Sequence, residues 1–303
     1  MPIRTVRRIA ALGLCAVALW LLPITARAQT PAPPAAGPLK VMTFNIRLGT
    51  AADGDNHWTR RREMLFDLLR REDADLVGLQ EAFRFQIEEI LAAVPGYAVA
   101  GVGRDDGKAG GETSAILFRA SRFHIASSGT FWFSDTPDTP GTRTWGNRYN
   151  RVSSWARFID RDGAAFWHYN LHLDHESQPS RERSVELLLT RMRGRAVPSE
   201  PVIVTGDFNV GEDNPALHYL VGGPGAKPGS AALVDTFRVL HPAVTEVGTF
   251  TAFKFGETRG DKIDYVLVLP GTRVLAAEIL RTSQDNRYPS DHFPVTARIS
   301  WAP

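Results

Sequence analysis

Short apolar runs rich in β-branched residues recur along most of the chain and predict strands. They span residues 40–46, 76–79, 114–118, 123–131, 152–159, 165–173, 202–205, 263–269, 273–280 and 295–301. Apolar residues at helical spacing predict helices at residues 59–71, 83–93 and 179–195. Strands outnumber helices, and several strands follow one another in the middle of the chain. We therefore expect two packed mixed sheets with helices outside them.

The first 28 residues have the pattern of a secretion signal. Arg4, Arg7 and Arg8 precede an apolar stretch at residues 9–22, and the small residues around position 28 offer a cleavage site. The apolar stretch is too short to span a bilayer comfortably. We expect a periplasmic or secreted protein without a stable membrane anchor.

Cleavage after Ala28 changes the charge balance of the chain. It removes four arginines and no acids, which takes 35 basic against 33 acidic residues to 31 against 33. The mature protein is then nearly neutral, which argues against a non-specific nucleic-acid binder. Cleavage also removes Cys15, the only cysteine, and so excludes a thiolate nucleophile and cysteine-ligated zinc. A Pro/Ala-rich linker at residues 29–38 precedes one domain at 39–303, which we expect to be a monomer.

The stretch PVIVTGDFNVGED, at residues 201–213, places an acid and an amide directly after an apolar run. The run predicts a strand covered on both faces. In an extended chain Asp207 and Asn209 point to the same side, while Phe208 turns away. Asp and Asn after Gly are also ordinary turn residues, so this stretch alone leaves a shared site and a simple turn both open.

Polar residues also sit at the ends of other predicted strands. They are Asn45, Gln80, Glu81, His172, Asp174, Asp264, Asp291 and His292. Each of them alone is more often a satisfied hydrogen-bond partner than a ligand. The Gly-rich segment at 101–111 is not a dinucleotide fingerprint, because Asp106 takes the third glycine position. We interpret it as a flexible loop, with Lys108 as a candidate substrate contact.

Taken in order, the motifs FNIR, QE, HLDH, GDFN, IDY and SDHFPV resemble the endonuclease/exonuclease/phosphatase superfamily of metal-dependent phosphohydrolases. They run from Val41 to Val295. The segments DGDNHWTRRREML and GTFWFSDTPDTPG look like an exported bacterial branch of it. The resemblance implies a four-layered α/β sandwich, dependence on Mg²⁺ or Mn²⁺, and hydrolysis of a phosphate ester by in-line attack of water.

The resemblance also implies roles for the metal and water residues. Glu81 is the expected metal ligand, because a carboxylate suits a hard octahedral cation. Asn45 is expected to hold the metal or a water bound to it. Asp207 is expected to orient and deprotonate the attacking water, and Asn209 to donate to a phosphoryl oxygen.

Three further residues match positions around the substrate. His172 matches a donor to the phosphate or the leaving oxygen, and Asp264 is expected to orient His172 or a metal-bound water. Arg151 matches a phosphate-binding arginine, although Arg148 is close enough in sequence to confuse the assignment.

Asp291 and His292 match the terminal acid and histidine of the family. Because adjacent residues of an extended segment point apart, either Asp207 or Asp291 could be the carboxylate that bonds His292. His292 is expected to contact the phosphate or to act as a base. His175 follows His172 by three residues, an odd number, so in an extended strand we expect it to face away from the site.

Two other classes of function compete with this interpretation. A two-metal phosphoesterase would need an early Asp-x-His and a late Asn-His pair, which the sequence lacks. A non-catalytic binding module on the same fold should have lost a metal ligand or the base, whereas all of these residues are present.

Among substrates, near-neutral charge disfavours a nuclease, and the absence of an evident apolar hairpin disfavours a sphingomyelinase-like enzyme. We expect a small phosphoester such as a sugar phosphate, with monoester and diester both open.

Overall fold

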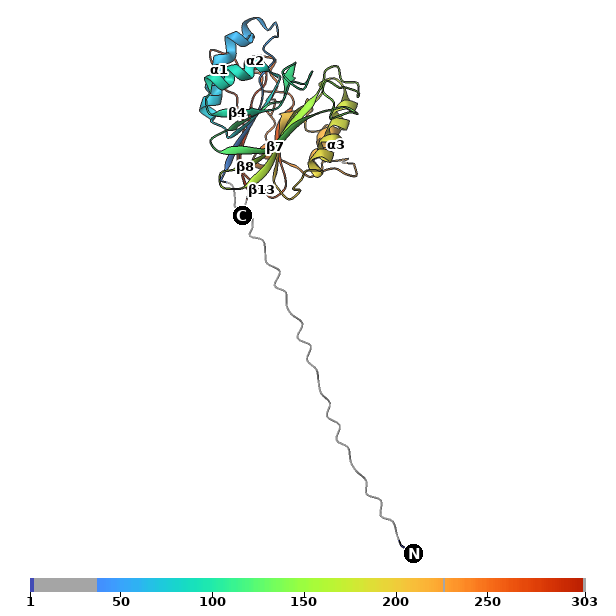
Figure 1. Ribbon diagram of the computed structural model, residues 1–303. Coiled ribbons are helices and arrows are strands. Elements are labelled where there is room, and N and C mark those ends of the chain that lie inside the picture. The colour runs from blue at the N-terminus through green and yellow to red at the C-terminus, as the bar shows by residue number, and fades with distance from the viewer. Residues whose placement is uncertain (3–36, 226, 302–303) are drawn as a thin grey trace. The chain divides into compact units, whose positions relative to one another are not determined.

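The computed structural model describes residues 1–2, 37–225 and 227–301 (Figure 1). The expected signal and linker, at 1–28 and 29–38, lie almost wholly outside these described residues. Among the described residues, no helix is long and apolar enough to cross a membrane.

Two six-stranded sheets form the centre of the domain. The first contains, in spatial order, β13 (Thr272–Ile279), β14 (Val295–Trp301), β1 (Leu39–Asn45), β2 (Leu76–Gln80), β6 (Ile116–Arg119) and β4 (Tyr97–Ala100). The second contains β11 (Val234–Asp235), β12 (Asp264–Val268), β10 (Val202–Asp207), β9 (Ala165–His172), β8 (Val152–Asp160) and β7 (Phe123–Trp132). Both sheets are mixed, because β1–β2 and β9–β10 are parallel pairs while the other pairs are antiparallel. A short ribbon pairs β3 (Ala82–Phe83) with β5 (Glu112–Thr113).

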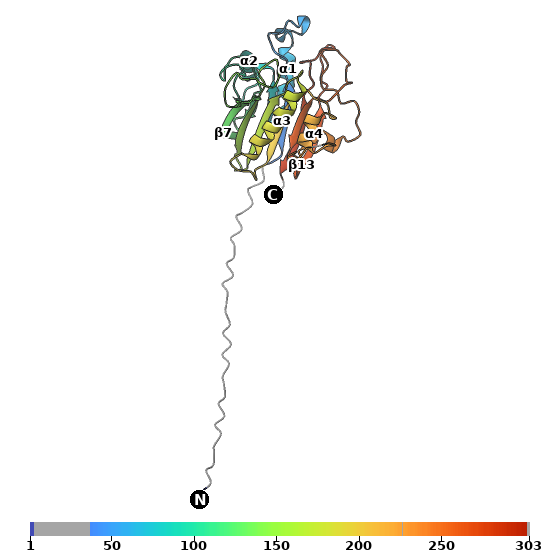
Figure 2. The same cartoon turned by 90° about the vertical axis from the view of Figure 1, so that its right-hand side faces the viewer.

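Helices cover the outer face of each sheet. On the first sheet lie α1 (Trp58–Glu72), preceded by the turn η1 (Gly54–Asn56), and α2 (Arg84–Ala93). On the second lie α3 (Gln178–Arg193) and α4 (Pro215–Val221), and α5 (Thr236–Leu240) follows β11. Figures 1 and 2 show α1 and α3 on opposite sides of the two sheets.

Three apolar clusters hold the layers together. Strand alternation explains how one strand serves two of them: Val41 of β1 faces the second sheet, whereas Met42 packs under the helices. On β10, Ile203 faces the first sheet and Val204 packs under α3 and α4. The order helix, sheet, sheet, helix is the predicted four-layered α/β sandwich, and the fold prediction is confirmed.

A polar group interrupts the apolar space between the sheets. The Asn170 amide donates to the carbonyls of Leu79 and Ala115, and its oxygen accepts from Gln80 at 2.7 Å and from Thr205 at 3.0 Å. Gly78 leaves room for this network, because a Cβ there would lie 2.2 Å from the Thr205 hydroxyl. These bonds fix the ends of β2, β9 and β10 relative to one another.

The predicted strands and helices are all present, with ends shifted by a few residues. The sequence analysis missed the short elements η1, β3, β4, β5, β11, α4 and α5. The helix α4 has only seven residues, too few for a clear periodicity, and its start is set by the Asn214 side chain, which accepts from the amide of Ala216.

Candidate active site

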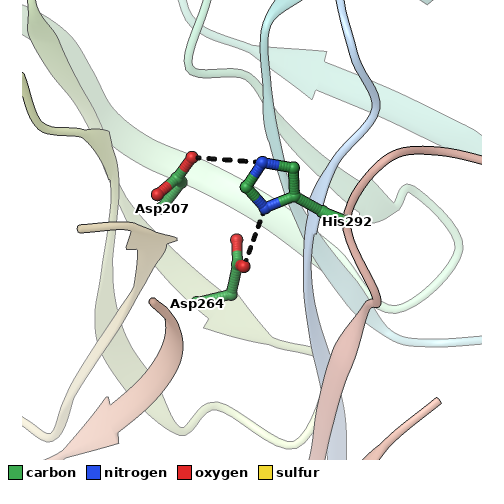
Figure 3. A group of neighbouring side chains, drawn as sticks. All are labelled: Asp207, Asp264 and His292. Atoms are coloured by element: carbon green, nitrogen blue, oxygen red, sulfur yellow. Dashed lines mark hydrogen bonds and ion pairs between the residues drawn. The ribbon is translucent and has the colours of Figure 1, made fainter. Parts of the chain in front are cut away.

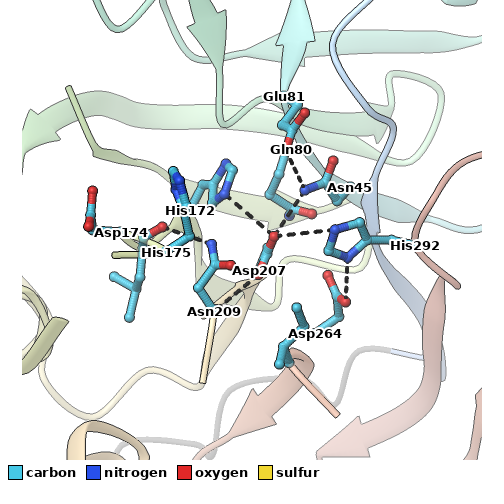
Figure 4. Close-up of polar contacts among 12 residues, drawn as sticks. Asn45, Gln80, Glu81, His172, Asp174, His175, Asp207, Asn209, Asp264 and His292 are labelled. Carbon is cyan, nitrogen blue, oxygen red and sulfur yellow. Dashed lines mark hydrogen bonds and ion pairs between the residues drawn. The ribbon is translucent and has the colours of Figure 1, made fainter. Parts of the chain in front are cut away.

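The ends of several strands meet at one edge of the two sheets. In the first sheet Asn45, the last residue of β1, pairs with Gln80, the last of β2. In the second sheet Asp207, at the end of β10, is paired with His172 on one side and Asp264 on the other. The Asn45 amide donates to Asp207 Oδ2 at 2.9 Å and so links the two sheets (Figure 4).

A cavity of about 490 Å³ opens at this edge. The predicted residues that line it are Glu81, Arg151, His172, Asp207, Asn209, Asp291 and His292. Asn45 and Asp264 are fully buried and reach the lining residues through hydrogen bonds. The structure therefore brings every predicted site residue to one place.

The chain turns sharply after the strands that supply these side chains. Asn209 has a left-handed backbone, with φ 51°, and its amide donates to Asp207 Oδ1 at 2.9 Å. Phe208, which lies between Asp207 and Asn209 in the sequence, is buried and packs on Tyr265. The stretch is thus both a turn and part of the site. One hydrogen of the Asn209 side-chain amide goes to the Leu173 carbonyl, which leaves the other for a ligand.

The carboxyl edge of the cavity fits a divalent cation. Glu81 also has a left-handed backbone, with φ 58°, and its carboxylate accepts from the Asn45 amide and from the backbone of Leu48. Burial, with Glu81 nearby, raises the pKa of Asp291, although His292 and Arg47 oppose the shift. A buried carboxylate that resists ionisation and a second carboxylate near it would supply the oxygen ligands that a hard cation such as Mg²⁺ prefers, and the cation would stabilise their charged forms.

His292 lies between two buried carboxylates (Figure 3). Its Nδ1 is 2.9 Å from Asp264 Oδ2, and its Nε2 is 3.8 Å from Asp207 Oδ2. Burial alone would lower the pKa of His292, but Asp264 and then Asp207 outweigh it and raise the pKa to about 10. We therefore assign an imidazolium to His292, which can donate a hydrogen bond but cannot accept a proton.

This geometry corrects two sequence predictions. The carboxylate that bonds His292 is Asp264, not Asp207 or Asp291, and Asp264 does not bond His172. The reason is the antiparallel register of β10 and β12, which puts the Asp264 side chain beside Asp207 and under the imidazole. Adjacent positions in the sequence could not reveal this pairing.

Asp207, Asp264 and His292 are also close enough together to hold a metal ion. A metal-bound imidazole must be deprotonated, whereas the two carboxylates hold His292 protonated. Glu81 and Asp291 form a second pair of carboxylates that could hold the cation.

The two other ionisable groups at the centre of the cavity have shifted pKa values. Burial, reinforced by Asp264, raises the pKa of Asp207 to about 7. Burial, reinforced by the charge of Arg151, holds the pKa of His172 well below its usual value. His172 Nε2 lies 3.4 Å from Asp207 Oδ2. Near neutral pH, Asp207 can therefore accept a proton, and His172 is a neutral hydrogen-bonding group.

Arg151 and not Arg148 belongs to the site. Arg151 is buried and lines the cavity, whereas Arg148 is exposed and lies 3.6 Å from Glu176. The prediction that His175 faces away is wrong: it lines the cavity, and its Nδ1 is 2.8 Å from Arg151 Nη2. Alternation fails here because β9 ends at His172 and the chain then bends.

Seven cavity residues were missed by the sequence analysis: Arg47, Leu48, Arg104, Glu112, Tyr149, Phe250 and Ile263. Arg47 belongs to the FNIR motif and could have been found there. It binds Asp53 with two bonds of 3.0 Å and lies 3.7 Å from Asp291. The segment 101–111 was interpreted as a loop, yet its Arg104 lines the cavity, whereas Lys108 is exposed and is not among the lining residues.

Two mixed sheets that bring acids, histidines and arginines to one cavity define an α/β-sandwich hydrolase. The chain belongs to the endonuclease/exonuclease/phosphatase family, whose sequence model matches residues 42–292. This family consists of phosphoesterase and nuclease hydrolases that typically bind a divalent metal ion. The predictions of the family and of an enzyme are confirmed.

Solved structures of similar proteins agree with this assignment. An endonuclease/exonuclease/phosphatase family protein from Bacteroides thetaiotaomicron is 30% identical, with a TM-score of 0.79 over 89% of this chain and 100% of that chain. A mannosyl-6-phosphatase from the same species is 32% identical, with a TM-score of 0.76 over 86% of this chain and 99% of that one. Among related sequences, an uncharacterised protein of Acanthamoeba polyphaga mimivirus is 26% identical over 187 residues, which are 56% of this chain and 67% of that protein.

Proposed function

We propose that this protein hydrolyses a phosphate ester by in-line attack of water, with Mg²⁺ or Mn²⁺ bound at Glu81 and Asp291. The observation that carries the proposal is that one cavity brings together the base Asp207, positively charged side chains and the carboxylates of Glu81 and Asp291. A divalent cation bound there would neutralise charge on the phosphoryl group and polarise its oxygens.

Side chains of the cavity have the other catalytic roles. Asp207, whose pKa is raised to about 7, orients the attacking water and takes its proton as the oxygen–phosphorus bond forms. The bond from phosphorus to the alcohol oxygen breaks on the opposite side, the leaving oxygen takes a proton from solvent water, and Asp207 returns its proton to the hydroxide so formed. Asn209, His172 and the His292 imidazolium donate to the phosphoryl oxygens as charge develops. Arg151 adds a fixed positive charge.

Three observations support a small substrate, and a sugar phosphate in particular. The mannosyl-6-phosphatase is 32% identical and is covered over 99% of its length. A cavity of about 490 Å³ is of the size that encloses a small molecule. The near-neutral charge after signal removal gives little attraction for nucleic acid. We also propose that the protein acts as an exported monomer, periplasmic or secreted, because of the signal-like first 28 residues.

A substrate panel tests the reaction. Sugar phosphates, a phosphodiester, single-stranded DNA and sphingomyelin would be offered to the protein with Mg²⁺ and with excess EDTA. We expect Mg²⁺-dependent phosphate release from sugar phosphates, with Asp207→Asn at least 100-fold slower because the base is lost. Faster hydrolysis of DNA or sphingomyelin would favour the nuclease or lipid alternative. Binding of these compounds without turnover would favour a non-catalytic module.

A further inference from the structure

Phe250 is an exposed aromatic residue at the wall of a polar cavity. It lines the cavity with 48% of its surface exposed, and its ring lies 5.1 Å from that of His292. Single exposed apolar residues are common on protein surfaces. Phe250 differs from them because it sits beside the proposed phosphate site.

The backbone around Phe250 is held rigidly. Thr251 donates to the carbonyl of Asp291 at 2.7 Å, and the carbonyl of Thr249 accepts from Phe293 at 2.7 Å. Phe250 is thereby bridged to His292, so the backbone that carries its ring is held beside the reacting groups.

The chain after Phe250 turns through a strained segment. Ala252 and Phe253 both have left-handed backbones, with φ 48° and 61°. Such conformations are strained in residues other than glycine and gather at functional sites. Phe253 anchors the turn, because its ring lies 5.6 Å from the guanidinium of the buried Arg61.

A second group of missed residues adds polar functions to the same cavity. Arg104 and Glu112 line it and are joined by an ion pair of 2.5 Å, with 11% of each side chain exposed. Only Oε2 of Glu112 is used in this pair. Tyr149 packs against Arg104 at 5.5 Å and stacks on His175.

We propose that Phe250 and the Arg104–Glu112 pair form a subsite for the alcohol half of the substrate, and that this half is a hydroxylated ring. A sugar ring has an apolar C–H face that packs on an aromatic ring, and hydroxyls that a carboxylate and a guanidinium bind. A cavity of about 490 Å³ has room for such a ring beside the phosphate. This inference rests on the proposed phosphoester hydrolysis and extends it to substrate selection.

Phe255 offers a matched control for Phe250. Both are exposed phenylalanines of one loop, but Phe255 packs on Tyr288 and does not line the cavity. Phe250→Ala and Phe255→Ala would be compared with the unmodified protein on mannose 6-phosphate and on glycerol 3-phosphate, which lacks a ring. Inhibition by inorganic phosphate would be measured as well, because it reports the phosphate site alone.

We expect Phe250→Ala to raise KM for mannose 6-phosphate about tenfold, as loss of a packed aromatic face would. KM for glycerol 3-phosphate and inhibition by phosphate should change less than about twofold, and Phe255→Ala should change none of them. An equal rise for both substrates, or no rise for either, would overturn the subsite. If the unmodified protein hydrolyses no phosphoester, the proposed function fails. If it hydrolyses them and Phe250→Ala matches Phe255→Ala, only the subsite fails.

Discussion

Replacing Asp264 by Asn removes the charge that keeps His292 protonated. The pKa of His292 is raised from 6.5 to about 10, with Asp264 the largest raising influence against the lowering effect of burial. At about 1.4 kcal/mol per pKa unit, this shift corresponds to roughly 5 kcal/mol of preference for the imidazolium. Most of that preference should disappear in Asp264→Asn, and His292 should be neutral at pH 7.

The Asp264→Asn substitution should shift the pH dependence of kcat in a defined direction. In the unmodified protein we expect an acid limb near the pKa of Asp207, about 7, and an alkaline limb near that of His292, about 10. Asp264 raises both pKa values, so Asp264→Asn should move both limbs to lower pH. At pH 7 the loss of one charged donor should lower kcat about 100- to 1,000-fold.

The stability of the fold should respond with a defined sign. A histidine whose pKa is raised on folding adds stability that is complete below its unfolded pKa and is lost as pH rises through its folded pKa. In urea unfolding, the free energy of unfolding of the unmodified protein should therefore fall between about pH 6.5 and 10 as this contribution is lost. The Asp264→Asn variant should not show this fall. Asp261→Asn, at an exposed acid nearby, is the control. Limbs that stay in place, or that move to higher pH, would refute the pairing of Asp264 with His292.

Three further predictions follow from other residues of the structure. Glu81→Gln should weaken Mn²⁺ binding at least tenfold, measured by calorimetry, while circular dichroism stays unchanged; equal affinity would exclude Glu81 as a ligand. Because His172 is neutral, His172→Gln should slow all aryl phosphates by the same factor, and a loss that grows with the basicity of the leaving group would instead make His172 a proton donor. Burial lowers the pKa of His168 to about 3, so the unfolded chain binds a proton that the folded one excludes, and stability should fall by up to about 1.4 kcal/mol per pH unit below 6.5. His168→Gln should flatten that slope in urea unfolding, and an unchanged slope would contradict the assignment.

The sequence predicted those parts of the fold and site that depend on local pattern. Asp207 and Asn209 follow an apolar run that predicts a buried strand, and they belong to a motif that matches the family. The partner of His292 was not predictable, because Asp264 reaches it through the register of β10 and β12. His175 was misplaced because strand alternation was extended beyond the end of β9.

Part of the cavity wall was missed for a similar reason. Arg104, Tyr149 and Phe250 come from loops that share no pattern in the sequence, and only the folded chain brings them to one cavity. Side chains from loops are positioned by the packing of the whole domain, which local periodicity does not report.

Hydrolysis of mannose 6-phosphate in water enriched in oxygen-18 tests the central claim most directly. If Asp207 activates water for attack on phosphorus, Mg²⁺ should be required, and each phosphate released should carry one oxygen-18 atom while the sugar carries none. Release should stop in EDTA and fall at least 100-fold in Asp207→Asn. Oxygen-18 in the sugar, or full activity of Asp207→Asn, would contradict the account.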